Sequence, residues 1–347
     1  MKRLAFYLAV LLAAICCDKP EKILFVGTYS DGFFAYDYQT GELMAKAPMP
    51  NPSFLAMNGN NVYAVSEMPD ERARVFAWKW SGEAFDLLGS QPTGLPEGGE
   101  DPCHVATDGR LLAVSNYSGG TLALYKLGAD GGISPLDSLI VSSTGGPDLS
   151  RQEKPHVHCS AFTPDGKHLF FSEFSADAIG ALDITGRIAN YRRVAQLPAD
   201  FGPRHLLFDA SGTHFYVIGE LSGDVAVFDY SACTLTLKQV VKADEVDARG
   251  AADIHLSPDG KYLYASLRLR NDGIAIFGVA PDGTLTKVSY QTTGPHPRNF
   301  CVTEKEVLVA CRDNDSIEIY RRNPRTGLLT YTGRRISVSK PVFVAVQ

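Results

Sequence analysis

The chain has 347 residues, of which 45% are hydrophobic and 21% charged, and its formal net charge is −6. This apolar content is sufficient to bury a large core in one closed array, so the length does not require several globular domains. The acidic balance and the lack of a basic stripe argue against binding to nucleic acid, which needs clustered Lys and Arg side chains against the phosphates.

Residues 1–17 are predicted to be a secretory signal peptide and not part of the fold. A basic start precedes the apolar run 4–15, which is too short to span a bilayer comfortably. The run ends at Cys16 and Cys17, and the residues before Cys16 imperfectly resemble a bacterial lipoprotein cleavage box. Two alternatives follow for the domain 18–347: attachment to the bacterial envelope through a lipid on Cys16 or Cys17, or release into the periplasm.

A proline-bearing phrase recurs along the rest of the chain and each time opens an apolar segment. Its prolines are Pro52, Pro102, Pro155, Pro203, Pro297 and Pro341. They lie about 50 residues apart, except for one double step whose middle copy, Arg249–His255, has no proline. A period of this size is typical of a propeller, a solenoid or another repeat array.

Each copy of the phrase predicts further strands. Second strands such as Asn61–Glu67 and His214–Glu220 are rich in β-branched and aromatic residues, and a third apolar segment follows in every copy. Turn clusters such as Pro164–Lys167 separate the first two strands, and no segment of helical period and length interrupts the series. Each repeat therefore supplies about four strands, as a propeller blade does.

The two ends of the chain are predicted to share one blade. Segments 23–29 and 33–38 resemble second and third strands that lack a first strand, and the C-terminal segment 341–347 can supply it. Closing the ring in this way removes the exposed edges of an open β array. We therefore predict an all-β, seven-bladed β-propeller, with the ring closed by pairing of the C-terminal strand with the N-terminal strands.

Alignment on the turn glycines brings chemically different side chains into two equivalent positions. Eight residues before Gly166, Gly212 and Gly260 lie His158, Arg204 and Ala252, respectively. Eight residues after the same glycines lie Phe174, Glu220 and Arg268. Because the first two strands of a blade are antiparallel, both positions should open on the same mouth of the central channel.

Further polar residues of the openings are expected at this mouth. Arg298 enters the first position through the opening 296–299, and His104 takes a similar place in the third blade. Glu173 is one residue out of step with Glu220, so its side chain should face the other way. Different side chains at repeated positions suit an asymmetric ligand, although the alternative is that they only form hydrogen bonds between blades.

The openings DPCH, KPHVH, GPRH and HPRN, together with the strands that follow them, resemble the lactonase family of seven-bladed propellers. This family includes a bacterial type of 6-phosphogluconolactonase and a fungal carboxy-cis,cis-muconate cyclase. The resemblance covers nearly all of the mature chain. It implies a small-molecule lactone substrate, no metal and no organic cofactor, and a catalytic set of His158, Arg204, Glu220 and Arg298. The remaining candidates, for substrate binding, are His104, Asn116, His156, His205 and Arg268.

Lactone hydrolysis requires an activated water, stabilisation of the developing oxyanion and a proton for the leaving alkoxide. Arg204 and Arg298 could anchor an anionic group and polarise the carbonyl. His158 is the expected general base, because the unperturbed pKa of histidine is about 6.5. A carboxylate flanked by two guanidiniums should have a lowered pKa, so Glu220 is expected to orient an arginine or His158.

Two other functions remain open. One is a cycloisomerase that closes or opens a muconolactone ring, and the other is a non-catalytic propeller that binds a ligand or partner at the cell surface. An export signal departs from the cytosolic role of a phosphogluconolactonase. Nothing in the sequence specifies an oligomeric state.

The five cysteines after residue 17 are odd in number and have no CxxC spacing, which argues against a disulfide framework and against a zinc site. We expect most of them to be buried as small hydrophobic side chains.

Overall fold

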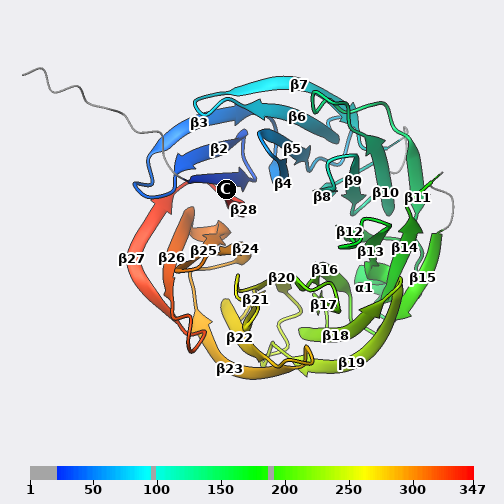
Figure 1. The fold of residues 1–347 in the computed structure, drawn as a ribbon, viewed down its shortest axis with the longest axis vertical. Helices are drawn as coiled ribbons and strands as arrows, with labels where there is room; N and C mark the ends of the chain where they lie inside the picture. The colour runs from blue at the N-terminus through cyan, green and yellow to red at the C-terminus, as the bar shows by residue number, and fades with distance from the viewer. Residues whose placement is uncertain (1–21, 95–98, 187–190) are drawn as a thin grey trace, which may run out of the picture.

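The computed structural model describes residues 22–94, 99–186 and 191–347, which form seven four-stranded antiparallel sheets arranged as blades around a central axis (Figure 1). The predicted signal peptide, with Cys16 and Cys17, lies outside the described residues. The predicted seven-bladed β-propeller is confirmed.

The first four blades, written from the axis outward, have the following strands. Blade 1 contains β28 (Pro341–Val346), β1 (Ile23–Thr28), β2 (Gly32–Asp37) and β3 (Leu43–Pro48). Blade 2 contains β4 (Pro52–Asn58), β5 (Asn61–Ser66), β6 (Arg74–Trp80) and β7 (Phe85–Pro92). Blade 3 contains β8 (Pro102–Thr107), β9 (Leu111–Asn116), β10 (Thr121–Lys126) and β11 (Ser138–Val141). Blade 4 contains β12 (Val157–Phe162), β13 (His168–Glu173), β14 (Ala178–Asp183) and β15 (Tyr191–Gln196).

The other three blades repeat the pattern. Blade 5 contains β16 (Pro203–Phe208), β17 (His214–Gly219), β18 (Asp224–Ser231) and β19 (Thr234–Lys242). Blade 6 contains β20 (Ala251–Leu256), β21 (Tyr262–Leu267), β22 (Gly273–Val279) and β23 (Leu285–Thr292). Blade 7 contains β24 (Pro297–Val302), β25 (Glu306–Cys311), β26 (Ser316–Arg322) and β27 (Leu329–Ser337).

The core lies between the blades. Second and third strands such as β9 and β14 are buried along almost their whole length because both faces of each sheet are covered by neighbouring blades, so they read as continuous apolar runs. Seven hydrophobic clusters fill the seven contacts between adjacent blades. Between blades 4 and 5, for example, the rings of Phe170 and Phe215 meet edge to face at 5.5 Å. Each blade therefore depends on its neighbours for burial.

The ring closes as predicted. Strand β28 pairs with β1, with Leu24 opposite Val346 and Phe25 opposite Ala345. The C-terminal strand thus completes blade 1, and a hydrophobic cluster containing Leu24 and Leu308 joins this blade to blade 7. Closure covers the edge that β1 would otherwise expose, and the two ends of the chain stabilise each other.

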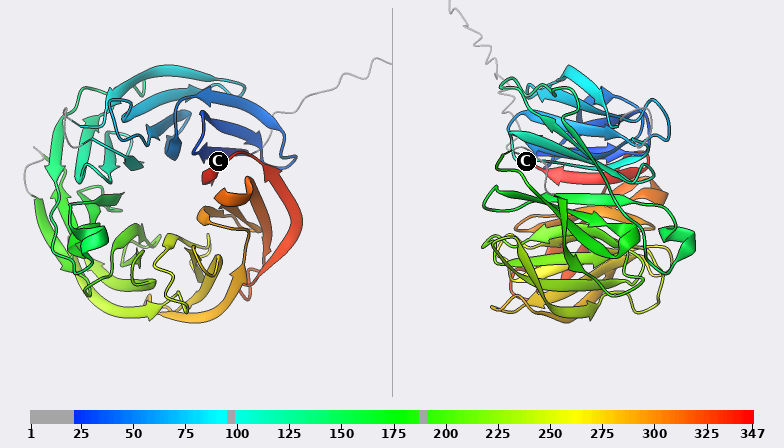
Figure 2. Two further views of the ribbon diagram at one scale, coloured as in Figure 1. Left: turned by 180° about the vertical axis from the view of Figure 1, so that it is seen from behind. Right: turned by 90° about the vertical axis from the view of Figure 1, so that its right-hand side faces the viewer.

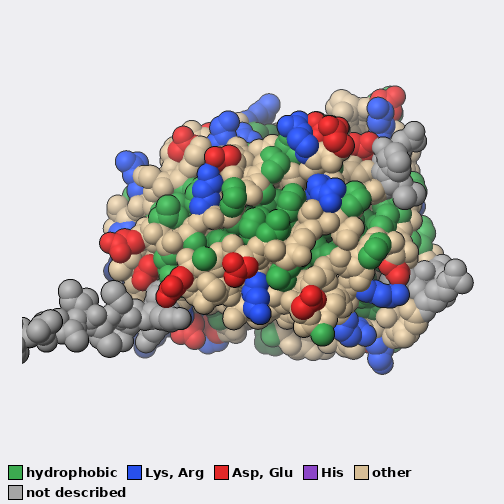
Figure 3. All heavy atoms as spheres, turned by 90° about the horizontal axis from the view of Figure 1, so that it is seen from above, with side chains coloured by type: hydrophobic (Ala, Val, Ile, Leu, Met, Phe, Trp, Pro, Cys, Tyr) green, Lys and Arg blue, Asp and Glu red, His purple; other side chains and the backbone are tan. Residues whose placement is uncertain are grey.

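The outer rim is more polar. Seen from the side of β3 and β7, hydrophobic side chains lie between charged ones (Figure 3). Leu43 and Leu87 are more than half exposed there, at 56% and 54%. Scattered exposed apolar side chains are ordinary for a folded protein.

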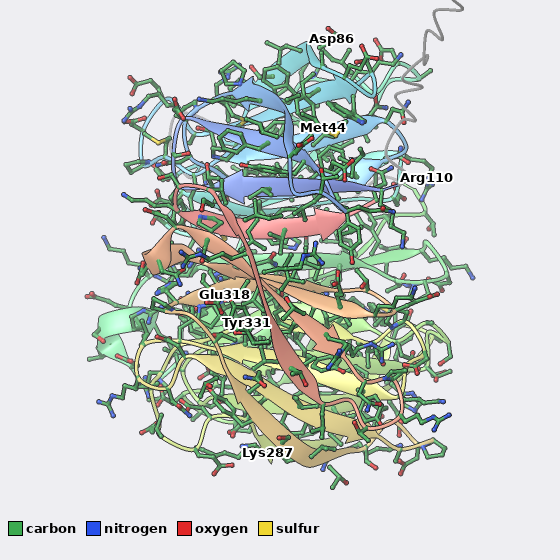
Figure 4. All side chains as sticks on the ribbon, turned by 90° about the vertical axis from the view of Figure 1, so that its left-hand side faces the viewer. Met44, Asp86, Arg110, Lys287, Glu318 and Tyr331 are labelled. Carbon is green, nitrogen blue, oxygen red and sulfur yellow. The ribbon has the colours of Figure 1, made fainter. Side chains whose placement is uncertain are left out.

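One helical turn departs from the predicted all-β series. Helix α1 (Leu149–Gln152) lies in the connection from blade 3 to blade 4, and two 3₁₀ turns follow β13 and β25 (Phe174–Ala176 and Arg312–Asn314). Helix α1 projects from one face of the ring, whereas Arg110, in the turn between β8 and β9, lies at the opposite face (Figures 2 and 4). Four residues are too few to show a helical period, so the sequence analysis missed α1. Within 22–94, 99–186 and 191–347 there is no helix long and apolar enough to cross a membrane.

Candidate active site at one mouth of the channel

A repeated hydrogen bond defines the mouth of the channel. In every blade, the amide of the residue after the second strand donates to a carbonyl just before the first strand, at 2.8–3.2 Å. The seven residues after the second strands are Tyr29, Glu67, Tyr117, Phe174, Glu220, Arg268 and Arg312. The matching first-strand residues are Val342, Ser53, Cys103, His158, Arg204, Ala252 and Arg298. These two predicted positions therefore do share one mouth, which is the face that carries α1.

The backbone that accepts this hydrogen bond is unusual in most blades. The accepting residue has a positive φ in five of them: Asn51, Asp101, Gly202, His296 and Lys340, with φ from 41° to 58°. Left-handed backbone is uncommon for residues other than glycine and carries a small energetic cost. In these five blades the left-handed residue presents its carbonyl to the second strand, and in blades 4 and 6 His156 and Gly250 accept the same hydrogen bond without a positive φ.

Glu220 is the centre of a buried charge cluster. Its Oε1 accepts from Nη2 of Arg151 at 2.7 Å, and its Oε2 lies 3.0 Å from Nε of Arg204 and 3.2 Å from Nη2 of Arg268. We call these four residues the Glu220 cluster. Burial opposes ionisation of the carboxyl group, but the three guanidiniums outweigh it and lower the pKa of Glu220 to about 2. Glu220 is therefore ionised and a poor proton acceptor, as the sequence analysis predicted.

The two buried arginines of this cluster also bind backbone carbonyls. Nη1 of Arg204, a side chain only 2% exposed, donates to the Ala252 carbonyl at 2.5 Å. Nε of Arg268 donates to the Gly250 carbonyl at 2.9 Å. Burial, opposed by Glu220 but assisted by Arg204, lowers the pKa of Arg268 to about 9. Both guanidiniums are thus buried cations that Glu220 and the backbone carbonyls hold in place.

Arg298 is held very differently. Its guanidinium carbon lies 5.2 Å from the centre of the Tyr29 ring, and Nη2 lies 3.9 Å from Oε1 of Glu67. The Tyr29 hydroxyl donates to the same Oε1 at 2.8 Å, which completes what we call the Arg298 cluster. The guanidinium makes no hydrogen bond to any residue that the structure describes. Its donors are therefore available to a ligand at the mouth.

His158 is a neutral imidazole. The residue is 4% exposed, its Nδ1 lies 3.8 Å from Sγ of Cys103, and the rings of Tyr117 and His205 lie 5.6 and 5.4 Å away. Burial, with added repulsion from Arg204, holds the pKa of His158 well below 6.5. The expectation that this pKa is unperturbed was wrong, because the imidazole is desolvated and lies among cations. Nε2 makes no hydrogen bond within the described part of the chain.

His205, one residue beyond Arg204, supports that arginine. Its Nδ1 lies 2.6 Å from Oδ1 of Asp253, and its Nε2 lies 3.0 Å from Nη1 of Arg204. Burial and Arg204 lower the pKa of His205 to about 4, so the ring is neutral. The carboxylate favours a proton on Nδ1, which leaves Nε2 as an acceptor for Arg204. His205 therefore acts through Arg204.

His104 does not occupy the position that the sequence analysis gave it. Strand pairing sets Pro102 opposite Asn116, as it sets Pro203 opposite Gly219, so Cys103 and not His104 is equivalent to Arg204. The shorter turn of blade 3 caused the error. His104 lies one residue further along the strand, where its ring packs 4.3 Å from that of Phe54.

The other predicted binding residues have defined partners. Asn116 is fully buried, and its amide donates to the Thr93 carbonyl at 2.7 Å, which ties β9 to the chain that follows β7. The ring of His156 stacks on that of Tyr117 with 4.1 Å between centres, and its Nδ1 lies 2.7 Å from the Tyr117 carbonyl. The side chain of Glu173 accepts a hydrogen bond from Nε of Arg193 at 3.3 Å. It thus lies apart from Glu220, in agreement with the prediction that its side chain faces the other way.

Three residues at the mouth were missed by the sequence analysis. Glu67 lies eight residues after the turn glycine Gly59, so the alignment used for blades 4 to 6 could have found it. Tyr29 holds the same position in blade 1. Arg151 had no such signal, because α1 lies outside the repeat.

The cysteines of the propeller are free thiols, and four of the five are buried, which confirms their expected role as small core residues. Within residues 22–94, 99–186 and 191–347, no group of three or more His, Cys, Asp or Glu side chains is arranged to hold a metal ion.

Comparison with known proteins identifies the family of this chain. The family described as "Lactonase, 7-bladed beta-propeller" matches residues 23–346. A 6-phosphogluconolactonase from Formosa agariphila is 32% identical, with 88% of this chain and 94% of that protein covered. The crystal structure of a proposed 6-phosphogluconolactonase from Bacteroides uniformis is 44% identical, with a TM-score of 0.89 over 94% of this chain and 100% of the other. A periplasmic gluconolactonase from Pseudomonas aeruginosa is 25% identical, with a TM-score of 0.84 over 94% of this chain and 98% of that one. The chain therefore belongs to the lactonase family of seven-bladed β-propellers, as its strand openings indicated.

Proposed function

We propose that this protein is a lactonase that opens the ring of a sugar lactone at the mouth that holds His158, Arg204, Glu220 and Arg298. The relatives named as 6-phosphogluconolactonases and gluconolactonase support the substrate class. The observation that carries the proposal is the free guanidinium of Arg298 at the same mouth as the neutral imidazole of His158. These are the two groups that lactone hydrolysis requires, a donor for the oxyanion and an acceptor for the proton of water.

In the proposed mechanism, Arg298 donates to the carbonyl oxygen of the lactone. Water attacks the carbonyl carbon while Nε2 of His158 accepts one of its protons, and a tetrahedral oxyanion forms against Arg298. The intermediate collapses, the bond between the carbonyl carbon and the ring oxygen breaks, and the imidazolium returns its proton to the leaving alkoxide. The product is the open hydroxy acid. The low pKa of His158 weakens it as a base but makes its imidazolium a good acid for the second step.

Arg204 and Arg268 have supporting roles in this mechanism. Glu220 and the backbone carbonyls hold both side chains in place. They contribute a positive potential at the mouth, where low local dielectric strengthens the effect on a developing negative charge.

We also propose that the N-terminal segment directs export and that the domain 18–347 acts at the bacterial envelope, either free in the periplasm or anchored through Cys16 or Cys17, in which case the lipid-bearing cysteine remains in the mature chain. The relative from Pseudomonas aeruginosa is named as periplasmic. Release of the native protein by osmotic shock would indicate a free form, and release only by detergent would indicate a lipid anchor.

The test of the activity is acid release by the purified mature chain, measured in a pH-stat with gluconolactone, 6-phosphogluconolactone and a muconolactone. We expect hydrolysis of a sugar lactone above its spontaneous rate. Turnover restricted to the muconolactone would favour the cycloisomerase. If no lactone is consumed while circular dichroism shows an intact β fold, the proposal fails and a binding propeller is the better description.

A further inference from the structure

We propose that Arg151, carried by α1, is a specificity-determining residue that binds an anionic substituent of the substrate, a phosphate or a carboxylate on the sugar chain. This inference rests on the proposed lactonase function and adds the part of the mouth that recognises the non-reacting end of the substrate. It rests on three observations: the contacts that hold α1 in place, the unused hydrogen-bond donors of Arg151, and the charge balance of the two clusters.

Helix α1 is fastened at both ends. The side chain of Asp148 caps the turn by accepting from the Ser150 amide at 2.9 Å, and it forms an ion pair of 2.6 Å with Arg249. At the other end, Gln152 is 1% exposed and donates to Oδ1 of Asp177 at 2.7 Å. A single turn has little stability of its own. These contacts to blades 4 and 6 are what hold it over the mouth.

The guanidinium of Arg151 is itself held on one side. Its Nη2 donates to Glu220 at 2.7 Å and to the Tyr117 hydroxyl at 3.1 Å. The guanidinium carbon lies 5.3 Å from the centre of the Phe174 ring. The remaining groups, Nε and Nη1, make no hydrogen bond to any described residue, and the side chain is 36% exposed. Arg151 is thus both positioned and open to a ligand, whereas the side chains of Arg204 and Arg268 are 2% and 5% exposed.

The charge balance within the two clusters favours an anionic ligand. The two clusters contain four guanidiniums and only two carboxylates, namely Arg151, Arg204, Arg268 and Arg298 against Glu67 and Glu220. His158 is neutral and adds no charge. An excess of positive charge in a partly buried mouth raises the local concentration of anions and strengthens their binding.

The two open arginines lie on different arcs of the ring. Arg151 contacts Tyr117, Phe174 and Glu220, which belong to blades 3, 4 and 5. Arg298, in blade 7, contacts Tyr29 and Glu67 of blades 1 and 2. A substrate with its carbonyl at Arg298 and an anionic group at Arg151 would therefore lie across the mouth.

The experiment compares Arg151→Gln with the wild-type protein on two substrates that differ only by one phosphate group, D-glucono-1,5-lactone and its 6-phosphate. Loss of charge-assisted hydrogen bonds should raise KM for the phosphorylated lactone about 10-fold or more. We expect kcat/KM for the neutral lactone to change by less than about 3-fold. Arg151→Lys should restore part of the affinity for the phosphate because it keeps the charge. Glucaro-1,4-lactone, which carries a carboxylate, distinguishes recognition of a carboxylate from recognition of a phosphate.

The matched control is Arg110→Gln, which removes an exposed arginine paired with Asp108 on the opposite face. This control should leave kcat and KM unchanged for both substrates. An equal fall in kcat for the neutral and phosphorylated lactones in Arg151→Gln would overturn the inference, because it would show that Arg151 only positions Glu220. Unchanged kinetics on every anionic lactone would overturn it as well.

Failure of the proposed lactonase function can be told apart from failure of this inference. If the wild-type protein hydrolyses no lactone, binding of 6-phosphogluconate is measured by calorimetry for the wild-type protein and for Arg151→Gln. Binding that is weakened about 10-fold or more by the substitution supports the anion site without the reaction. Equal binding, or none, rejects it.

Discussion

The two arginine clusters at the mouth use the same side chain for different purposes. In the Glu220 cluster, one buried carboxylate is shared by three guanidiniums at 2.7–3.2 Å, and the two innermost arginines also bind backbone carbonyls. In the Arg298 cluster, a single guanidinium lies over a tyrosine ring with its nearest carboxylate oxygen 3.9 Å away. Arg204 and Arg268 are buried and fixed in place, whereas the guanidinium of Arg298 makes no hydrogen bond within the described residues and is open to a ligand. Four predictions test this difference.

The largest effect is expected on stability in the Glu220 cluster. Glu220→Ala leaves three guanidiniums without their carboxylate, two of them buried, and should lower the free energy of unfolding by about 3–5 kcal/mol. Urea denaturation measures this change in the free energy of unfolding. The matched variant at the Arg298 cluster is Glu67→Gln, which should cost about 1 kcal/mol or less because the ion pair is long and partly exposed. Similar losses in the two variants would remove the distinction between the clusters.

The Glu220 cluster should also make the fold sensitive to acid. The pKa of Glu220 is lowered to about 2 in the folded protein from a reference value of 4.5. The carboxylate therefore contributes stability above pH 4.5, on the order of 3 kcal/mol, which is lost as the pH falls from 4.5 through 2. The difference in unfolding free energy between the wild-type protein and Glu220→Gln should shrink across this range. A difference that is independent of pH would contradict the assignment.

In the Arg298 cluster the effect should appear in catalysis and not in stability. Arg298→Ala removes the proposed oxyanion donor and should reduce lactone turnover by about 100-fold or more. Its unfolding free energy should change by about 1 kcal/mol or less, since the guanidinium makes no hydrogen bond within the described residues. Steady-state kinetics and urea denaturation of the same preparation provide both values. Unchanged turnover in a folded variant would rule out Arg298 as the oxyanion donor.

The smallest effect concerns the pH dependence of the reaction. Because the pKa of His158 lies well below 6.5, the imidazole is already neutral at pH 6.5. We expect kcat/KM, corrected for spontaneous hydrolysis, to vary by less than about twofold between pH 6.5 and 8 and to fall only at lower pH. An acidic limb centred at or above pH 6.5 would show that His158 is not desolvated as in the structure, or that another group is the base.

Particular residues show why sequence reasoning reached most of the site but not all of it. Arg204 and Glu220 could be placed at one mouth because Gly212 sets the register of both strands around it. The same method failed for His104, since the turn of blade 3 is shorter and the register moves by one residue. It offered nothing for Arg151, which reaches the mouth from a connection between blades and depends on contacts to residues far along the chain.

The sequence alone determined the propeller, its seven blades and the closure of the ring, because apolar runs, turn residues and a fixed period are local properties that repeat along the chain. It also predicted the low pKa of Glu220, since the alignment of the repeats brings this carboxylate and the arginines to the same mouth. Only the tertiary structure decided which arginines are buried and fixed, which ones keep free donors at the mouth, and that His158 is neutral. These properties depend on burial and on distances between side chains from different blades, and neither can be deduced from the sequence of a single repeat.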